Sequence, residues 1–362
     1  MELITTMATL DRQLGIFGFS EELQQELAEY CAFLRHREDL LQLAQQYHDD
    51  IFENDRYSLA DVEQLPERDG REQGMLFAVM YLARCLRMEE VLGKRGIPAS
   101  YAAGAILTCK AQLEKNKEYY GCYGYKGAYR YRLVGYLMPS QLIIGRLCFQ
   151  MTTFGGPYHV YRSRRNGTVI PVALPGYAYL PNGKRASKEE TGTVFAPTLE
   201  EGTVIRGYTF DEEGVLLFDP VELDGGEYEK VLQTGDPVLS IHIPKNGKLS
   251  EASVEDAFAQ AEMFFKNYYP EKSFAAYICS SWLLDTGLKT ILKPESNILK
   301  FQPRFRIVLG GVNVFSLYWH IFDMQQFRPL TELKPQNPFQ QTMLEYVKKG
   351  NSLYSGYGFI LR

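Results

Sequence analysis

Residues 238–250 read VLSIHIPKNGKLS, and this stretch predicts how the second half of the chain is built. Its first six residues favour a buried strand because aliphatic and β-branched side chains dominate them, and Pro244 and Gly247 then end the strand. His242 is the exception among these apolar residues. An imidazole one residue from the carboxyl end of a core strand either hydrogen-bonds to the backbone there or serves a site.

The residues that follow favour a site. Ser250 is a typical helix N-cap with Glu251 in the first turn, and apolar residues then recur on one helix face up to Pro270. Residues 273–284, SFAAYICSSWLL, form a second strand-like run. A strand–helix–strand unit of this length favours a right-handed crossover between parallel strands, which brings both carboxyl ends to one sheet edge. Ligands bind at that edge in open sheets, so we expect His242 to belong to a site there.

The rest of the chain predicts two domains. The length of the chain, 362 residues, also favours two domains, because a domain has roughly 150 residues. Residues 71–92 are apolar nearly all round, which is typical of the central helix of a bundle. From about residue 140, β-branched and aromatic runs alternate with glycine, proline and aspartate turns, as in antiparallel strands. We therefore expect an α+β protein, with a helical domain over residues 1–135 and a mixed sheet flanked by helices over residues 136–362.

Composition argues against several kinds of partner. The chain has 39 basic and 44 acidic residues, a net charge of −5, without a long run of one sign, so we expect no nucleic acid or membrane partner. No stretch approaches the roughly 18 apolar residues of a membrane helix. The N-terminal sequence MELITTMATLDRQLGIF lacks a basic region followed by an apolar core, so we expect no signal peptide and a cytoplasmic protein.

The six cysteines are scattered and include no C-x-x-C pair, which indicates reduced, mostly buried thiols and no metal site. Near residue 125, tyrosines alternate with Lys126, Arg130 and Arg132. This pattern fits a stacking surface for single-stranded nucleic acid, or tyrosines that pack at a domain junction with their basic neighbours in solvent. The acidic chain favours the second interpretation.

Several segments together resemble a known family. Antiparallel strands followed by a β-α-β unit resemble the GNAT acyltransferase fold. The closer resemblance is to a bacterial family of acyltransferases with a helical N-terminal N-acyltransferase domain and a GNAT-like C-terminal domain. It rests on HIPKNGKLS (242–250), CSSWLL (279–284), SNILKFQPRF (296–305), GRLCFQ (145–150) and SGYGFI (355–360). It covers most of the chain, and residues 242–305 are its most specific part.

The resemblance implies an N-acyltransferase that moves an acyl group from the co-substrate acyl-CoA to a small-molecule amine by direct attack. In the wider superfamily, CoA lies where the fourth and fifth strands splay apart, and a loop that opens the next helix holds its pyrophosphate. Residues 238–243 and 274–281 correspond to these strands. The usual loop pattern is R/Q-x-x-G-x-G/A, whereas residues 244–248 read PKNGK, with one glycine.

The same resemblance suggests roles for individual residues. His242 accepts a proton from the amine or orients it. A hydroxyl of Ser280 or Ser281, or the phenol of Tyr277, assists departure of the thiolate. Strand alternation places Cys279 and Ser281 on one face with Tyr277, and Ser280 on the other. The candidates for binding CoA lie by the helix start and in the family-like segment: Ile243, Lys245, Asn246, Gly247, Lys248, Trp282 and Asn297.

Each candidate also has a structural interpretation. His242 fits a core histidine, Cys279 a small buried thiol, and Asn297 a residue that ties loops together. Arg146 is a charge within an apolar strand, so it needs a partner or an exit to solvent. The arginines of YRSRRNG (161–167) fit either the 3′-phosphate of CoA or a solvated hairpin, and the hairpin is favoured.

Two further functions stay open. One is a non-catalytic GNAT-like ligand-binding or regulatory protein that has lost the standard pyrophosphate loop, which the single glycine favours. The other is a Cys/His hydrolase. It requires Cys279 and His242 within hydrogen-bond reach, as does a transferase in which they form a nucleophilic pair and pass through an acyl-enzyme. A titratable His242 that faces an opening favours an enzyme, whereas an imidazole sealed by apolar neighbours favours a binding protein.

Overall fold

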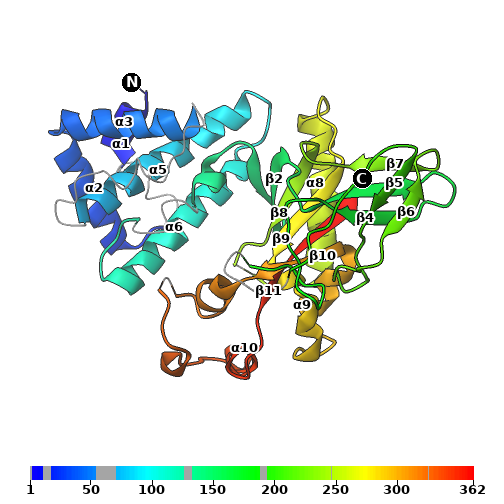
Figure 1. The fold of residues 1–362 in the computed structure, drawn as a ribbon. Coiled ribbons are helices and arrows are strands. Elements are labelled where there is room, and N and C mark those ends of the chain that lie inside the picture. The colour runs from blue at the N-terminus through cyan, green and yellow to red at the C-terminus, as the bar shows by residue number, and fades with distance from the viewer. Residues whose placement is uncertain are drawn as a thin grey trace. The chain divides into compact units, whose positions relative to one another are not determined.

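The computed structural model describes most of the chain, namely residues 2–10, 18–53, 71–125, 133–187, 194–245, 247–324 and 326–362. The chain divides into two compact units, residues 1–144 and 145–362. Figure 1 shows that the first unit is helical and that the second contains most of the strands. The protein is α+β, as the sequence predicts.

The first unit is a helical bundle that ends in a short strand. Its elements are α1 (Glu2–Thr9), α2 (Glu21–Leu34), α3 (Glu38–Phe52), α5 (Arg71–Gly93), α6 (Ser100–Tyr120), the 3-10 turn η3 (Gly135–Leu137) and β1 (Gln141–Ile144). α2 begins after Ser20 because the serine hydroxyl accepts a hydrogen bond from the Leu23 N–H. Residues 75–83 of α5 are all buried, so this helix forms the centre of the bundle, as its apolar character predicts.

The main sheet carries the predicted strand–helix–strand unit. Within the second unit, its strand order is β2-β8-β9-β11-β10. The strands of the second unit are β2 (Leu147–Thr153), β8 (Pro237–His242), β9 (Ala276–Ser281), β10 (Arg306–Val312) and β11 (Tyr354–Leu361). β8 and β9 are parallel and are joined through α8 (Glu251–Tyr268), whereas β2–β8, β9–β11 and β10–β11 are antiparallel. The carboxyl ends of β8 and β9 therefore lie at the same edge.

Smaller elements complete the second unit. The other strands are β3 (Tyr158–Ser163), β4 (Val169–Ala173) and β7 (Tyr228–Leu232), in the order β4-β3-β7, and the pair β5 (Val204–Gly207) and β6 (Val221–Asp224). The other helical segments are η4 (Trp282–Leu284), η5 (Thr286–Thr290), α9 (Asn297–Phe301), η6 (Gln302–Arg304), the π-helical η7 (Ser316–Ile321), η8 (Leu330–Glu332) and α10 (Pro338–Lys348). Arg164 and Arg165 are exposed between β3 and β4, which supports the solvated hairpin.

The main sheet is packed on both faces. On one face, the Phe149 ring of β2 lies 6.0 Å and 6.5 Å from the rings of Phe258 and Phe265 on α8, and 5.8 Å from Tyr277 on β9. The other face packs against the sheet that contains β3. The buried side chains of this second core include Tyr158, Val160, Val238, Ala276, Val308 and Phe359. Burial on both faces holds β8 and β9 in place independently of their own pairing.

The contacts of Phe149 predict a large loss of stability on truncation. Phe149 is completely buried, so Phe149→Ala removes its ring contacts and leaves a cavity. We expect the free energy of unfolding to fall by about 3–5 kcal/mol. Urea unfolding measures this change. Met263→Ala on α8 is the control, because Met263 is 59% exposed, and its effect stays within about 0.5 kcal/mol. Equal effects of the two substitutions would contradict the packing described here.

Candidate active site

The parallel ladder between β8 and β9 ends early, and the candidate site lies where it ends. The ladder pairs Val238 with Ala276, Leu239 with Tyr277, and Ser240 with Ile278. Beyond these pairs, β8 stays paired to β2 as far as His242, and β9 stays paired to β11 as far as Ser281. Each strand therefore follows its outer neighbour, and the two strands splay apart towards their carboxyl ends.

The register settles which side chains share a face at this splay. Because Ser240 pairs with Ile278, alternation places His242 and Ser280 on the same face. Cys279 and Ser281 lie on the opposite face, the one that Tyr277 shares with Phe149 and α8. The structure thus brings His242 and Ser280 to one side of the opening and separates both from Cys279.

His242 is held in an orientation that suits a base. Its Nε2 lies 2.8 Å from Oε1 of Gln150 on β2. An amide oxygen only accepts, so Nε2 carries the proton and Nδ1 keeps a lone pair. Burial lowers the pKa of His242 below its ordinary value of 6.5, which favours the neutral imidazole at neutral pH. Among the described residues, Nδ1 has no hydrogen-bond partner and is free to accept a proton.

Cys279 and Tyr277 have structural surroundings. Cys279 is 1% exposed, and burial raises the pKa of its thiol to about 12. The Tyr277 hydroxyl donates to Glu262 over 2.6 Å, and burial followed by this bond raises the pKa of the phenol. Both side chains face α8, so neither reaches His242. The structure argues against a Cys279–His242 pair and against Tyr277 as the acid that serves the leaving thiolate.

Ser280 and Ser281 lie on opposite faces of β9. Ser281 Oγ accepts a hydrogen bond from the Leu283 N–H over 3.2 Å and so caps η4. Ser280 is exposed and shares the face of His242. Of the hydroxyls predicted from the sequence, Ser280 is the one that remains available at the splay.

The loop between β8 and α8 is tied at both ends. Nζ of Lys245 donates to the Trp319 carbonyl over 2.9 Å and forms an ion pair with Asp323. Arg146 donates to the carbonyls of Gly247 and Lys248, each over 3.0 Å. The sequence predicts that Arg146 needs a partner or an exit to solvent, and these carbonyls are its partners. Asn246 lies outside the described residues.

The same loop offers hydrogen-bond donors. Ser250 caps α8 by accepting from the Ser253 N–H over 3.3 Å. Within the described residues, the N–H groups of Gly247, Lys248 and Leu249 donate no hydrogen bond. Free N–H groups at the start of a long helix attract an anion. The loop beside Ile243 and Lys248 thus has the donors of an anion site without the usual glycine pattern.

A third segment reaches this edge from β10. β10 is antiparallel to β11, which is antiparallel to β9, so β10 ends at the same edge as β8 and β9. The following residues include η7, whose Trp319 carbonyl contacts Lys245. β9 and β11 lie between β8 and β10 in the sheet. The segment that runs from the end of β10 to Trp319, where it contacts Lys245, therefore passes across the carboxyl end of β9 and the amino end of β11.

Trp282 and Asn297 lie elsewhere. The Trp282 ring packs 6.3 Å from Phe339 in a separate apolar cluster, and Asn297 is exposed at the start of α9. In the part of the chain that the structure describes, neither contacts the β8–α8 loop through a hydrogen bond or a ring. A direct role of Trp282 and Asn297 in holding CoA stays a prediction.

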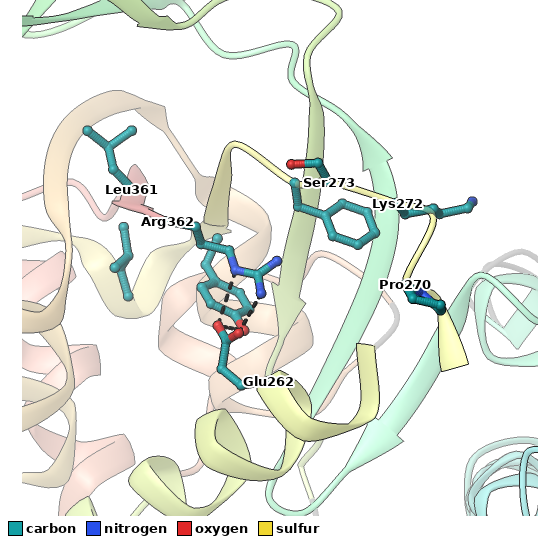
Figure 2. A pocket seen from close by; sticks show the side chains of 9 residues that line it. Glu262, Pro270, Lys272, Ser273, Leu361 and Arg362 are labelled. Carbon is teal, nitrogen blue, oxygen red and sulfur yellow. Dashed lines mark hydrogen bonds and ion pairs between the residues drawn. The ribbon is translucent and has the colours of Figure 1, made fainter. Parts of the chain in front are cut away.

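A hollow of about 720 Å³ lies near the amino end of β9, away from the splay. Figure 2 shows that Glu262 and Arg362 point toward one another in this hollow. Glu262 within it accepts from Tyr277 and from Nε of Arg362, over 2.6 Å and 3.1 Å. The charged groups of Glu262 and Arg362 thus neutralise each other. We therefore place the candidate site at the splay and not at this hollow.

The described residues contain no group of three or more histidine, cysteine, aspartate or glutamate side chains arranged to hold a metal ion. Among the described helices, none has the length and apolar character needed to cross a membrane.

Comparison with known proteins identifies the fold. Two parallel strands that splay before a helix-opening loop define a GNAT-like domain, and residues 142–360 match the family described as GNAT-like C-terminal domain. Residues 8–129 match the N-acyltransferase N-terminal domain. The chain therefore belongs to the family that joins an N-acyltransferase N-terminal domain to a GNAT-like C-terminal domain.

Solved acyltransferases share this fold. An acyltransferase variant in complex with octanoyl-CoA aligns with a TM-score of 0.63 at 16% identity, over 97% of this chain and 86% of that one. An acyltransferase in complex with decanoyl-CoA and teicoplanin aligns with a TM-score of 0.58 at 16% identity, over 100% and 99%. A third, with decanoyl-CoA, gives 0.53 at 18%, over 82% and 69%. No curated protein matches the chain.

The burial of Cys279 predicts an unreactive thiol. With a pKa of about 12, only about one molecule in ten thousand carries the thiolate at pH 8. We expect iodoacetamide to modify the half-buried Cys122 while Cys279 stays unlabelled until the protein is unfolded. Mass spectrometry of the peptides measures both rates. Labelling of native Cys279 as fast as Cys122 would restore the acyl-enzyme interpretation.

The lowered pKa of His242 predicts a pH-dependent stability. The folded state favours the neutral imidazole, so this contribution is complete above pH 6.5 and is lost as the pH falls through the folded pKa. We expect the imidazole to titrate below pH 6.5 by NMR. The difference in unfolding free energy between the wild type and His242→Gln should shrink from pH 7 to pH 5. The other histidines are present in both proteins, so their contributions cancel. A midpoint above 6.5 would contradict this assignment.

Proposed function

We propose that the protein transfers an acyl group from acyl-CoA to an amine by direct attack on the thioester. The observation that carries the proposal is the splay of β8 and β9, which places His242 and Ser280 on one face beside a helix-opening loop with free N–H groups. The similar solved acyltransferases in complexes with octanoyl-CoA and decanoyl-CoA support acyl-CoA as the donor. Membership of an N-acyltransferase family supports an amine as the acceptor.

The proposed step uses the free Nδ1 of His242. The amine nitrogen attacks the thioester carbonyl carbon, and its proton passes to Nδ1. The carbon–sulfur bond breaks, and the hydroxyl of Ser280 donates a hydrogen bond to the departing thiolate. The imidazolium of His242 then returns its proton to the sulfur, which leaves as the free thiol. No acyl-enzyme forms, in agreement with the buried Cys279.

The donor fits the residues of the β8–α8 loop. The N–H groups of residues 247–249 and the amino end of α8 would receive the pyrophosphate, with Lys248 as a nearby cation. Lys245 is engaged by Asp323, so its share in holding the phosphates requires exchange of that partner. The ion pair between Lys245 and Asp323 and the single glycine of the loop favour the second candidate function, a protein that binds a ligand at the splay without catalysing a reaction.

Ligand stabilisation and turnover distinguish the two functions. An acyl-CoA at 100 times its dissociation constant should raise the unfolding free energy by about 2.7 kcal/mol. Thermal unfolding with acetyl-, butyryl-, octanoyl- and palmitoyl-CoA tests the donor. With the donor that binds, and a panel of amines, we expect His242→Gln to lower kcat by about 100-fold or more without loss of donor binding.

The control is His159→Gln, which alters a half-buried histidine on β3 and should leave kcat unchanged. Stabilisation by a donor without turnover of any amine would favour the binding protein. The absence of stabilisation by every donor would overturn acyl-CoA as the ligand.

A further inference from the structure

Arg146 reaches the β8–α8 loop from the turn that precedes β2. Gly145 in this turn has a φ of +59°, and a Cβ there would lie 3.1 Å from the Cα of Ala257, so the turn lies directly against α8. From this position, Nε of Arg146 donates to the Lys248 carbonyl and Nη2 donates to the Gly247 carbonyl, each over 3.0 Å. One guanidinium thus holds two consecutive carbonyls of the loop.

These two bonds determine where the loop's donors point. In a trans peptide unit, the C=O and the following N–H point in opposite directions. Because the carbonyls of Gly247 and Lys248 point at Arg146, the N–H groups of Lys248 and Leu249 point away from it. Neither N–H has a partner among the described residues. Gly247 has a φ of +97°, a conformation that glycine adopts without strain, which allows the chain to present this arrangement.

The charge of Arg146 is not neutralised in the described part of the chain. Among the described residues, no carboxylate forms an ion pair with it, and its Nη1 is buried without a hydrogen-bond partner. Burial lowers the pKa of Arg146, but a guanidinium remains protonated at neutral pH. A fixed positive charge therefore lies behind the loop, close to the amino end of α8, and both favour an anion in front of the loop.

We propose that Arg146 is a positioning residue that shapes residues 247–249 into a diphosphate-binding loop. This role of Arg146 rests on the proposed function, because the diphosphate is that of acyl-CoA. In this arrangement a guanidinium from a neighbouring turn does the work that several glycines do in the usual loop. The guanidinium orients the N–H groups by binding the carbonyls of the same peptide units. Its positive charge also attracts the diphosphate without direct contact.

Two donors separate this role from general support of the fold. Acyl-CoA carries the diphosphate, whereas the matching acyl thioester of N-acetylcysteamine lacks it. We expect Arg146→Met to raise KM for acyl-CoA about tenfold, equivalent to about 1.4 kcal/mol, with kcat within about twofold. With the N-acetylcysteamine thioester, kcat/KM should change by less than about twofold. Arg146→Lys, which keeps the charge and loses the two-pronged contact, should lie between the wild type and Arg146→Met.

The matched control is Arg164→Met. Arg164 also donates to a glycine carbonyl, that of Gly226 over 3.2 Å, but it lies in the turn between β3 and β4. It should leave both donors unaffected. Equal losses with both donors, or no loss in Arg146→Met, would overturn the positioning role.

Inorganic pyrophosphate tests the same idea in the wild-type protein, which avoids any failure of a variant to fold. It should inhibit competitively against acyl-CoA and leave the N-acetylcysteamine thioester unaffected. If the wild type binds acyl-CoA and pyrophosphate does not compete, the loop proposal alone fails. If the wild type binds neither acyl-CoA nor pyrophosphate, the proposed function fails with it.

Discussion

The candidate site depends on a β8–β9 ladder that stops after Ser240 and Ile278. Two parallel strands normally continue to pair until one of them ends, and here both continue without each other because each has an outer partner. β2 holds β8 as far as His242, and β11 holds β9 as far as Ser281. The opening is therefore made of strands that keep their hydrogen bonds on their outer sides, which gives the side chains at the splay a rigid backbone.

Packing allows this loss of pairing without loss of order. α8 covers one face of the main sheet, where its aromatic side chains pack against Phe149 of β2. The sheet that contains β3 covers the other face. Hydrophobic burial on both faces offsets the ladder bonds that the splay gives up, because each fully buried aromatic or aliphatic side chain contributes about 1.5–3 kcal/mol. The polar residues of the site need no core role, so His242 and Ser280 are free to differ chemically from their apolar neighbours.

Much of this arrangement follows from local sequence pattern, and the rest follows from contacts between distant residues. The strand–helix–strand unit was predictable from N-cap chemistry and apolar periodicity, and strand alternation alone separates Ser280 from Cys279. The pattern could not show that Lys245 meets Asp323 or that Arg146 meets the β8–α8 loop. Those contacts join segments far apart in the chain, and only the sheet order brings them together. An isolated charge in an apolar run, as at Arg146, was the one local signal available.

The position of β11 also has a consequence for how the chain folds. β11 lies between β9 and β10 in the sheet, yet it follows both in the sequence. During synthesis, β9 and β10 emerge with exposed edges that have no partner until residues 354–361 leave the ribosome. Unpaired strand edges promote association with other chains. The second unit thus depends on β11 to join β10 to the rest of the main sheet. Nascent chains that stop before β11 would be prone to aggregate.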